Sequence, residues 1–397
     1  MYQAPLPSEY QALSRDEIAA RIRAAKAKLG DRVVILGHHY QRDEIVEHAD
    51  SMGDSYKLCK DAQLRPEAEY IVFCGVHFMA ESADILTDKV VILPNLAAGC
   101  SMADMANIMQ VKSAWRQIQE VLGEPEFSDS REFAVAASER QPSNPAAPSA
   151  APPKSAVLPV TYINSAANLK AFVGERGGTV CTSTNAPGAV KWALAQSERV
   201  LFFPDQHLGR NTGVKLGFDP ERDMCVWDPF KPLGGNTPEK IRSSKFLLWK
   251  GHCSVHMRFT VEQVAQAREQ HPEIQVIVHP ECTLDVVRQA DFVGSTQYII
   301  ETILQSETGS TWAVGTEINL VSRLAKAMPD RTIFCLDPQV CPCSTMYRIH
   351  PSFLLWALEN LAEGRVVNEV AVPSEVRANA RLALDRMLDV SAQPVAD

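Results

Sequence analysis

Short runs of β-branched and aliphatic residues alternate along the chain with longer stretches in which apolar positions recur at helical spacing. The first long stretch, residues 14–30, is predicted to be an amphipathic helix, because Ser14 and Glu17 make a capping box and Gly30 follows as a stop signal. The run VVILG then predicts a buried strand, and YIVFCGV and VVIL predict two more. Strands that alternate with helices indicate a parallel α/β sheet with right-handed crossovers.

One order of features occurs three times: a strand-like run, two polar residues spaced by one position, a serine or threonine, and an isolated cysteine. Such repetition is typical of a fold built from similar units. We therefore predict three similar three-layer α/β domains with parallel sheets, at residues 14–104, 105–255 and 256–397, with one cysteine of each at a shared centre. The three sets are His38, Tyr40, Ser55 and Cys100; Tyr162, Asn164, Ser183 and Cys253; and His279, Glu281, Ser295 and Cys343.

Two stretches interrupt this alternation. Residues 128–156 are rich in Pro, Ala and Ser and cannot bury enough apolar surface to order themselves, so we expect a disordered surface insertion in the second unit. Residues 206–245 are rich in Gly, Pro and Asp and are expected to be irregular. A loop of that length in a compact domain is usually functional or disordered.

Composition narrows the class of protein. Of the 397 residues, 46% are hydrophobic and 22% charged, as in ordinary globular proteins. A net charge of −9 without a Lys/Arg-rich stripe argues against nucleic acid as the main partner. No apolar stretch approaches the roughly 20 residues that span a bilayer, and the N-terminus lacks the layout of a secretory signal. We therefore expect a cytosolic protein without a membrane partner, whose ten cysteines do not form a disulfide framework.

The polar pairs come directly after predicted strands, and ligands of parallel sheets bind beyond the carboxyl ends of the strands. Alternate residues that leave a strand point the same way, so each pair can face one cleft. Taken singly, His38 also fits a loop histidine, and Tyr162 a core residue with its hydroxyl on a carbonyl. The serines are expected to cap helices. Because helix N-termini also bind anions, they would suit a dicarboxylate or a phosphate ester.

Three cysteines far apart in sequence suit a metal better than a nucleophile, because a nucleophile needs one thiolate beside a base. Cys253 with His256 still leaves a Cys–His hydrolase open. Soft thiolates select zinc or an iron–sulfur cluster. With three cysteines in place of the usual four, a [4Fe-4S] cluster keeps one iron open to act as a Lewis acid.

The third ligand can be either cysteine of Cys341-Pro-Cys343. Two other classes remain as alternatives. One is a zinc-dependent lyase or hydrolase that uses His279, Glu281 and His256. The other is a non-catalytic iron–sulfur carrier or sensor, which would not need so many acid–base groups at strand ends.

The chain resembles the quinolinate synthase family in segments that occur in order and at the expected spacings: ILGHHYQ, GDS, LPNLAAGCSMADM, VTYINS, CTSTNA, FFPDQHLGRN, WKGHCSVH, VIVHPEC and DFVGST. The similarity covers residues 14–390, apart from the Pro-rich insertion and parts of 206–245. It implies three α/β domains around a pseudo-threefold axis with a [4Fe-4S] cluster at the centre. It also implies condensation of iminoaspartate with dihydroxyacetone phosphate to quinolinate, with release of phosphate and water, in NAD biosynthesis. A functional link to the enzyme that supplies iminoaspartate follows from that reaction.

Carried over residue by residue, the family's cluster ligands fall on Cys100, Cys253 and one cysteine of the CPC segment. The residues that follow, 346–349, match the family's pattern after the third ligand and place it at Cys343, not Cys341. A disulfide across Cys-Pro-Cys would be strained, so we expect no redox switch there. The substrate contacts fall on His38, Tyr40, Ser55, Tyr162, Asn164, Ser183, His256, His279, Glu281, Ser295 and Thr296.

Four of these residues, Glu281, Tyr40, His38 and His256, are expected to be catalytic. Glu281 is our choice of general base, with Tyr40 and His38 moving protons. His256 and His279 are expected to offset the negative charge of the substrate, together with the helix N-termini at the three serines. The open iron would bind the four-carbon substrate.

Overall fold

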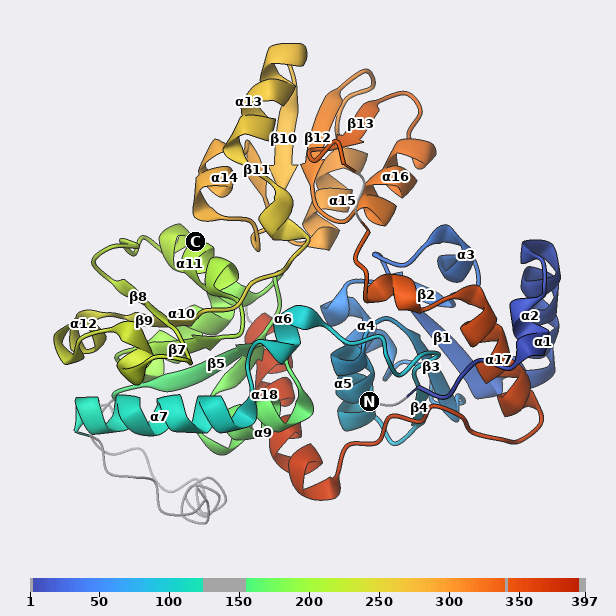
Figure 1. Ribbon diagram of the computed structural model, residues 1–397, viewed down its shortest axis with the longest axis horizontal. Helices are drawn as coiled ribbons and strands as arrows, with labels where there is room; N and C mark the ends of the chain where they lie inside the picture. Colours follow the sequence, from blue (N-terminus) through green and yellow to red (C-terminus); the bar gives the residue numbers. More distant parts are fainter. Residues whose placement is uncertain (1–2, 124–154, 340–341, 393–397) are drawn as a thin grey trace, which may run out of the picture.

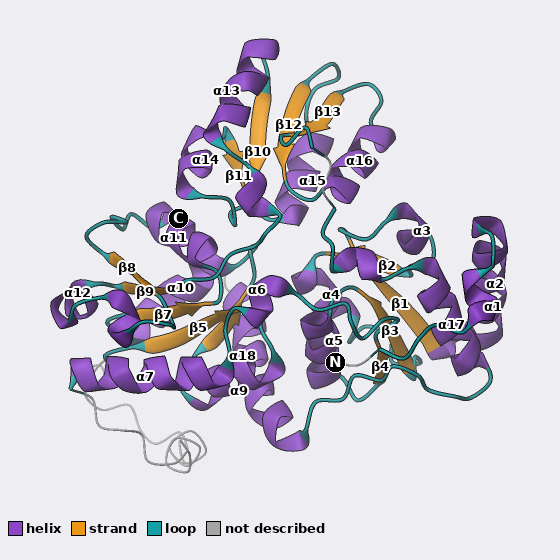
Figure 2. Ribbon diagram, viewed as in Figure 1, coloured by secondary structure: helices purple, strands orange, loops and turns teal. Residues whose placement is uncertain are grey.

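Three groups of helices and strands surround a common centre in the computed structural model, which describes residues 3–123, 155–339 and 342–392 (Figure 1). Each group holds one parallel sheet flanked by helices (Figure 2). The predicted fold class, three α/β units with parallel sheets, is therefore confirmed. Most of the expected insertion (residues 128–154) and Cys341 lie outside the described residues. Among the described residues, no helix combines the length and apolar character needed to cross a membrane.

The first unit follows the hydrophobic runs closely. The run VVILGH is buried along its whole length as β1, and it pairs in parallel with β3, with Ile35 opposite Val72. The predicted capping box is present at the start of α2, where the Ser14 backbone N–H donates to Glu17 at 2.8 Å. The sheet order is β2-β1-β3-β4. The elements are α1 (Ser8–Gln11), α2 (Arg15–Leu29), η1 (Gly30–Arg32), β1 (Val33–His38), α3 (Asp43–Val46), β2 (Ser51–Gly53), α4 (Ser55–Asp61), β3 (Tyr70–Cys74), α5 (His77–Leu86), β4 (Val90–Ile92) and α6 (Ser101–Asp104).

The second unit repeats this order and adds a strand, giving β6-β5-β7-β9-β8. The expectation that residues 206–245 are irregular is wrong: this stretch forms two helices, a 3-10 turn and the edge strand β8, which pairs in parallel with β9. Short elements separated by Gly, Pro and Asp give a loop-like composition even when they are ordered. The elements are α7 (Ile108–Leu122), β5 (Leu158–Tyr162), α9 (Ala167–Glu175), β6 (Thr179–Cys181), α10 (Ala186–Gln196), β7 (Val200–Phe203), α11 (Gln206–Lys215), β8 (Met224–Trp227), η2 (Pro232–Gly235), α12 (Pro238–Ser243) and β9 (Phe246–Trp249).

The third unit has the order β11-β10-β12-β13, the same as the first. Its sheet carries separate apolar clusters on its two faces, whereas the first two units share one continuous core. The third unit therefore meets the others mainly through polar side chains. Its elements are η3 (His256–Arg258), α13 (Val261–Gln270), β10 (Gln275–Val278), α14 (Leu284–Gln289), β11 (Phe292–Val293), α15 (Thr296–Leu304), β12 (Thr311–Gly315), α16 (Ile318–Ala327) and β13 (Thr332–Cys335); the turn η4 (Met346–Arg348), which follows, packs against the first unit.

The last two helices leave the third unit, to which the sequence had assigned them. Helix α17 (Pro351–Ala362) packs against α2 of the first unit, and α18 (Ser374–Ala392) packs against α9 and β6 of the second. Both appear in red beside those units in Figure 1. Their apolar faces join the core that the first two units share. An amphipathic pattern predicts a helix but does not say which sheet the helix covers, so the expected boundary at 256–397 does not describe the packing.

Candidate active site

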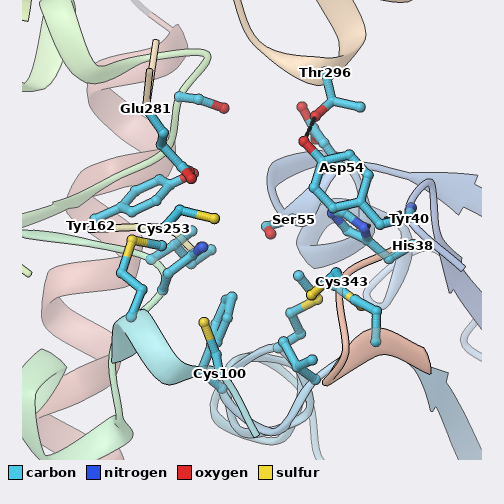
Figure 3. Close-up of a pocket in the computed structure, with 18 of the residues that line it drawn as sticks. His38, Tyr40, Asp54, Ser55, Cys100, Tyr162, Cys253, Glu281, Thr296 and Cys343 are labelled. Carbon is cyan, nitrogen blue, oxygen red and sulfur yellow. Dashed lines mark hydrogen bonds between the residues drawn. The ribbon is translucent and has the colours of Figure 1, made fainter. Parts of the chain in front are cut away.

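A cavity lies where the three units meet, at the carboxyl ends of their parallel strands. Its walls carry the polar pairs and cysteines of all three sequence repeats (Figure 3). Ser295 is the one predicted site residue that does not line the cavity, since its hydroxyl caps α15 by accepting the Tyr298 N–H at 3.3 Å. The predicted residues on the wall are His38, Tyr40, Ser55, Cys100, Tyr162, Asn164, Ser183, Cys253, His256, His279, Glu281, Thr296 and Cys343.

Glu281 is the most constrained polar group of the cavity. It stands three residues beyond β10, is 3% exposed, and accepts hydrogen bonds from the Tyr162 hydroxyl at 2.6 Å and from Nδ1 of His256 at 2.9 Å. The rings of His256 and His279 stack with centroids 4.5 Å apart. Burial raises the pKa of Glu281, but His279, His256 and Tyr162 together hold it below its usual value. The side chain is therefore a carboxylate at neutral pH.

A continuous chain of hydrogen bonds crosses the cavity through Glu281. On the other side of the His256 ring, the Nε2 atom lies 3.3 Å from the Thr316 hydroxyl. That hydroxyl lies 2.8 Å from the hydroxyl of Tyr40. The Tyr40 hydroxyl also contacts Thr296 at 3.1 Å (dashed in Figure 3). The chain begins at Tyr162 of the second unit and ends at Tyr40 of the first. It gives a path along which a proton can move between groups that are far apart in sequence.

The two histidines that follow strands are neutral. Burial is the main cause that lowers the pKa of His38 and of His279 to about 3 each. His38 accepts the Tyr40 backbone N–H at Nδ1, 3.1 Å away. A neutral ring meets an anionic ligand by donating a hydrogen bond and not by its charge. This refines the expectation that His279 offsets charge on the substrate.

The capping role predicted for two of the three serines is wrong. Asp54 caps α4, because its carboxylate accepts the Lys57 N–H at 2.9 Å, so Ser55 is the first helical residue. Helix α10 begins at Ala186, three residues beyond Ser183, with Asn185 at its N-cap. Both serine side chains lie on the cavity wall instead. The nearby Asn164 has a buried Oδ1 atom without a hydrogen-bond partner among the described residues, as expected of a group that meets a ligand.

The three cysteines occupy equivalent places in the three units. Each precedes a serine and a short helical turn, namely α6, η3 and η4. Figure 3 shows Cys100, Cys253 and Cys343 around one part of the cavity. Burial is the main cause that raises the pKa of the Cys100 thiol to about 12 and that of Cys253 well above its usual value, and neighbouring thiols contribute to both shifts. Thiols whose charge is penalised by neighbouring thiols, as at Cys100 and Cys253, fit a site that is completed by a cation.

The donor atoms indicate how such a group would be held. A tetrahedral zinc with sulfur ligands at about 2.3 Å needs its sulfurs within about 4 Å of one another. Among the described residues, one set of three donors lies entirely within 4.8 Å, and it is Cys253, His256 and Glu281, not the three thiols. The three thiols thus suit a larger cluster, whereas the second set suits a single ion.

Sequence reasoning missed three groups that shape the site. Thr316 follows the strand WAVG and completes the hydrogen-bond chain; Asp205 and Glu317 each stand two residues beyond a strand and cap a helix. A polar residue directly after a buried run was a usable signal for all three. The motif FFPDQHLGRN was noted only for its resemblance to a family.

A cavity with convergent acid–base groups and three thiols, at the carboxyl ends of parallel strands, is typical of the active site of an α/β enzyme. The family model described as quinolinate synthetase A protein matches residues 20–389. A quinolinate synthase of Corynebacterium glutamicum is 54% identical over 99% of this chain and 93% of its own length, and one of Herpetosiphon aurantiacus is 54% identical over 96% and 95%. One of Streptomyces coelicolor is 52% identical over 96% and 90%. The chain belongs to the quinolinate synthase family.

Proposed function

We propose that this protein condenses iminoaspartate with dihydroxyacetone phosphate to quinolinate, as a step of NAD biosynthesis in the cytoplasm. Atoms balance when each turnover releases one phosphate and two waters, so no oxidant is required. The observation that carries the proposal is that three thiols from three units line the same cavity as the Tyr162–Glu281–His256 set. Family membership supports the choice of product. The substrate would reach the protein from an enzyme that makes iminoaspartate.

Cys100, Cys253 and Cys343 would hold a [4Fe-4S] cluster. Their softness, their placement around the cavity and the penalty that neighbouring thiols put on the charges of Cys100 and Cys253 fit that group. When bound, a cluster with three protein ligands supplies a Lewis-acidic iron for the loss of water. The rest of the chemistry falls to the side chains of the chain.

Proton movement is assigned to the hydrogen-bond chain. A general base works best with a pKa near the working pH, and the carboxylate of Glu281 is held below that range. We therefore propose that Glu281 and His256 act as a pair, in which Glu281 orients the ring and His256 takes the proton. Tyr40, with His38 beside it, faces the triose carbons and exchanges protons through Thr316.

Binding of two anionic substrates is assigned to neutral donors. The hydroxyls of Ser55 and Ser183, the hydroxyl of Thr296 and the amide of Asn164 line the cavity. These groups, with the ring of His279, can donate hydrogen bonds to carboxylate or phosphate oxygens, and none of them places a buried positive charge in the cavity.

A zinc-dependent reaction is the second candidate, because Cys253, His256 and Glu281 have donor atoms close enough for one ion. Cys100 and Cys343 separate the two hypotheses, since neither belongs to the zinc set. Zinc chemistry predicts that serine at either position leaves metal content unchanged. The cluster predicts that both variants lose iron and sulfide.

The test is anaerobic incubation of the purified protein with both substrates, with quinolinate measured by chromatography. Cys100→Ser, Cys253→Ser and Cys343→Ser should each lose the visible absorbance of the cluster and the product. Cys225→Ala, in the edge strand β8, is the control and should keep both. Retention of full activity by any of the three serine variants would contradict the ligand assignment, and absence of quinolinate from the wild-type reaction would contradict the proposed function.

A further inference from the structure

Three equivalent helices connect the cysteines of the site to its acid–base loops. Helices α5, α11 and α16 each contain ten residues. They follow strands β3, β7 and β12, and each of these strands is the third along the chain in its own sheet and pairs with the first. Each helix contacts two loops at the cavity. One belongs to its own unit and carries the cysteine, and the other belongs to the next unit and carries the polar pair.

The first end of each helix holds the cysteine loop of its own unit. In α11, Asp205 caps the helix by accepting the N–H groups of His207 and Leu208 at 2.7 and 2.8 Å, and the first backbone N–H of the helix donates at 3.0 Å to the carbonyl of Gly251, two positions before Cys253. In α16, the cap Glu317 accepts the Cys343 N–H at 3.2 Å. In α5, the backbone N–H of His77 donates at 2.8 Å to the carbonyl of Ala98, two positions before Cys100.

The second turn of α11 holds the loop that carries Glu281. Asn211, the sixth residue of the helix, donates from Nδ2 to the carbonyls of Pro280 and Cys282, both at 2.8 Å. These two carbonyls flank Glu281 on either side. Asn211 is 6% exposed, and its Oδ1 atom has no partner among the described residues. The amide is therefore oriented by its donors alone, because the reverse orientation would set its oxygen against two carbonyl oxygens.

The second turn of α16 holds the loop that carries Tyr40 in the same way. Arg323 is also the sixth residue of its helix, and it donates to the carbonyls of His39 and Gln41, which flank Tyr40. Asn319 of the same helix donates to the Tyr40 carbonyl itself at 3.2 Å.

The equivalent contact between the first unit and the second uses a carboxylate. Glu81 of α5 accepts the backbone N–H of Ala167 at 3.0 Å, just beyond the loop of Tyr162 and Asn164. The contacts thus run from the first unit to the second, from the second to the third, and from the third back to the first.

We propose that Asn211 and Arg323 are positioning residues that fix the loops of Glu281 and Tyr40 at a set distance from Cys253 and Cys343. This inference rests on the proposed function, because it takes those loops to be catalytic. Each helix acts as a rigid spacer between a metal ligand of one unit and a proton-transfer group of the next. Since the two apolar clusters on the third unit's sheet are separate from the core of the other two units, with Tyr40 packed against both sides, these polar contacts are placed to set the register of the third unit at the cavity.

The experiment compares Asn211→Ala and Arg323→Met with Asn236→Ala, all as anaerobically purified holoenzyme. Asn236 is a matched control: its Nδ2 also donates to backbone carbonyls, at 2.9 Å to Val226, but it lies within the second unit and touches no site loop. Asn211→Ala should accelerate amide hydrogen exchange in residues 279–283, and Arg323→Met in residues 38–42. The control should change neither peptide. Asn211 lies in the second unit and the peptide 279–283 in the third. General loosening of the second unit would therefore accelerate exchange in peptides of the second unit.

Activity supplies the second readout. A loop displaced by about 1 Å can cost about 10²-fold in rate, so both variants should lower kcat by ten- to a hundredfold with a smaller change in KM, while the cluster absorbance stays. Arg323→Lys should lower kcat less than Arg323→Met does, because lysine keeps the positive charge. It should not reach the wild-type kcat, because lysine lacks the guanidinium fork that spans two carbonyls. Asn211→Ser replaces Asn211→Ala if that variant does not fold.

Unchanged exchange in both peptides would overturn the inference, and so would faster exchange with kcat within twofold of the wild type. A wild-type protein that makes no quinolinate would refute the proposed function, while the exchange measurement would still decide whether the two side chains fix those loops.

Discussion

At the scale of single residues, the site is defined by which hydrogen bonds each side chain has already made. Glu281 has both carboxylate oxygens occupied, by Tyr162 and His256, whereas Ser55 and Ser183 line the cavity and the Oδ1 atom of Asn164 has no hydrogen-bond partner among the described residues. The first group is prepared for proton movement and the second for binding. Such a division is expected when binding groups must exchange water for ligand.

Thr316 offers the sharpest test of the hydrogen-bond chain. Thr316→Val keeps the shape of the side chain but removes the hydroxyl that lies between Tyr40 and His256. General acid–base catalysis contributes about 10²–10⁴-fold, so we expect kcat to fall at least tenfold, with the visible absorbance of the cluster unchanged.

Thr316→Ser, which keeps the hydroxyl, is the matched control and should retain most of the activity. If the valine variant turns over as fast as the serine variant in steady-state assays, the chain is not a proton path.

The sequence predicted twelve of the site residues in the repeats and placed all but Ser295 on the cavity wall, because strand ends of parallel sheets converge. It could not predict the helix caps correctly. Asp54 and Ser55 are adjacent residues that can both cap, and only the backbone angles at the turn decide that Asp54 takes the N-cap. Thr316 was missed for another reason: its position after a buried run was a signal, but a lone threonine there carries no chemical signature of its own.

At the scale of helices and strands, the close approach of α9 and α18 decides how the second unit is covered. Gly174 of α9 lies so near to α18 that a Cβ atom there would overlap the backbone carbonyl of Asn379. Backbone cannot yield as a flexible side chain does. The glycine is therefore required by contact between two helices that are far apart in the chain.

This contact predicts opposite effects of one substitution at two sites. Gly174→Ala should lower the free energy of unfolding by about 1–3 kcal/mol through overpacking. Gly188→Ala, in helix α10, should raise it by up to about 1 kcal/mol through helix propensity, because the new Cβ meets only Val390 Cγ1 at 3.8 Å. Thermal or urea unfolding followed by circular dichroism measures both, and equal changes at the two sites would show that α18 does not pack as described.

Element prediction succeeded where periodicity was local and failed where partners were remote. The capping box of α2 and the strand β1 followed directly from the sequence. Helix α18 was also predicted, but its apolar residues Ala380, Ala383 and Leu384 give no sign that they face the second unit. Strand β8 is only four residues long and is flanked by turn-forming residues, so its pairing with β9 comes from the tertiary fold.

At the scale of the whole molecule, buried ionisable groups make stability depend on pH in both directions. Burial raises the pKa of Asp205 and of Glu317, and stability from such groups is lost as the pH rises. Buried histidines act in the opposite sense. Burial lowers the pKa of His39 to about 4, so between pH 6.5 and 4 the unfolded chain binds a proton that the folded chain does not, and stability falls as the pH falls.

His39→Gln isolates this term from the others. Each such group changes the free energy of unfolding by up to about 1.4 kcal/mol per pH unit between its folded and unfolded pKa. The Tm of the variant should therefore fall less than that of the wild type between pH 7 and pH 5. Calorimetry at the two pH values gives the comparison. Parallel pH profiles for the two proteins would mean that His39 is protonated at its ordinary pKa.

The placement of the last two helices has a consequence for the order in which the protein is made. A ribosome completes the strands of the first unit early, but α2 stays uncovered until residues 351–362 have emerged, and α9 until 374–392 have followed. The part of the chain that is synthesised first is thus among the last to be finished. A nascent chain must keep two apolar helix faces from other molecules through most of its translation, and a ribosome that stalls before residue 351 leaves both exposed.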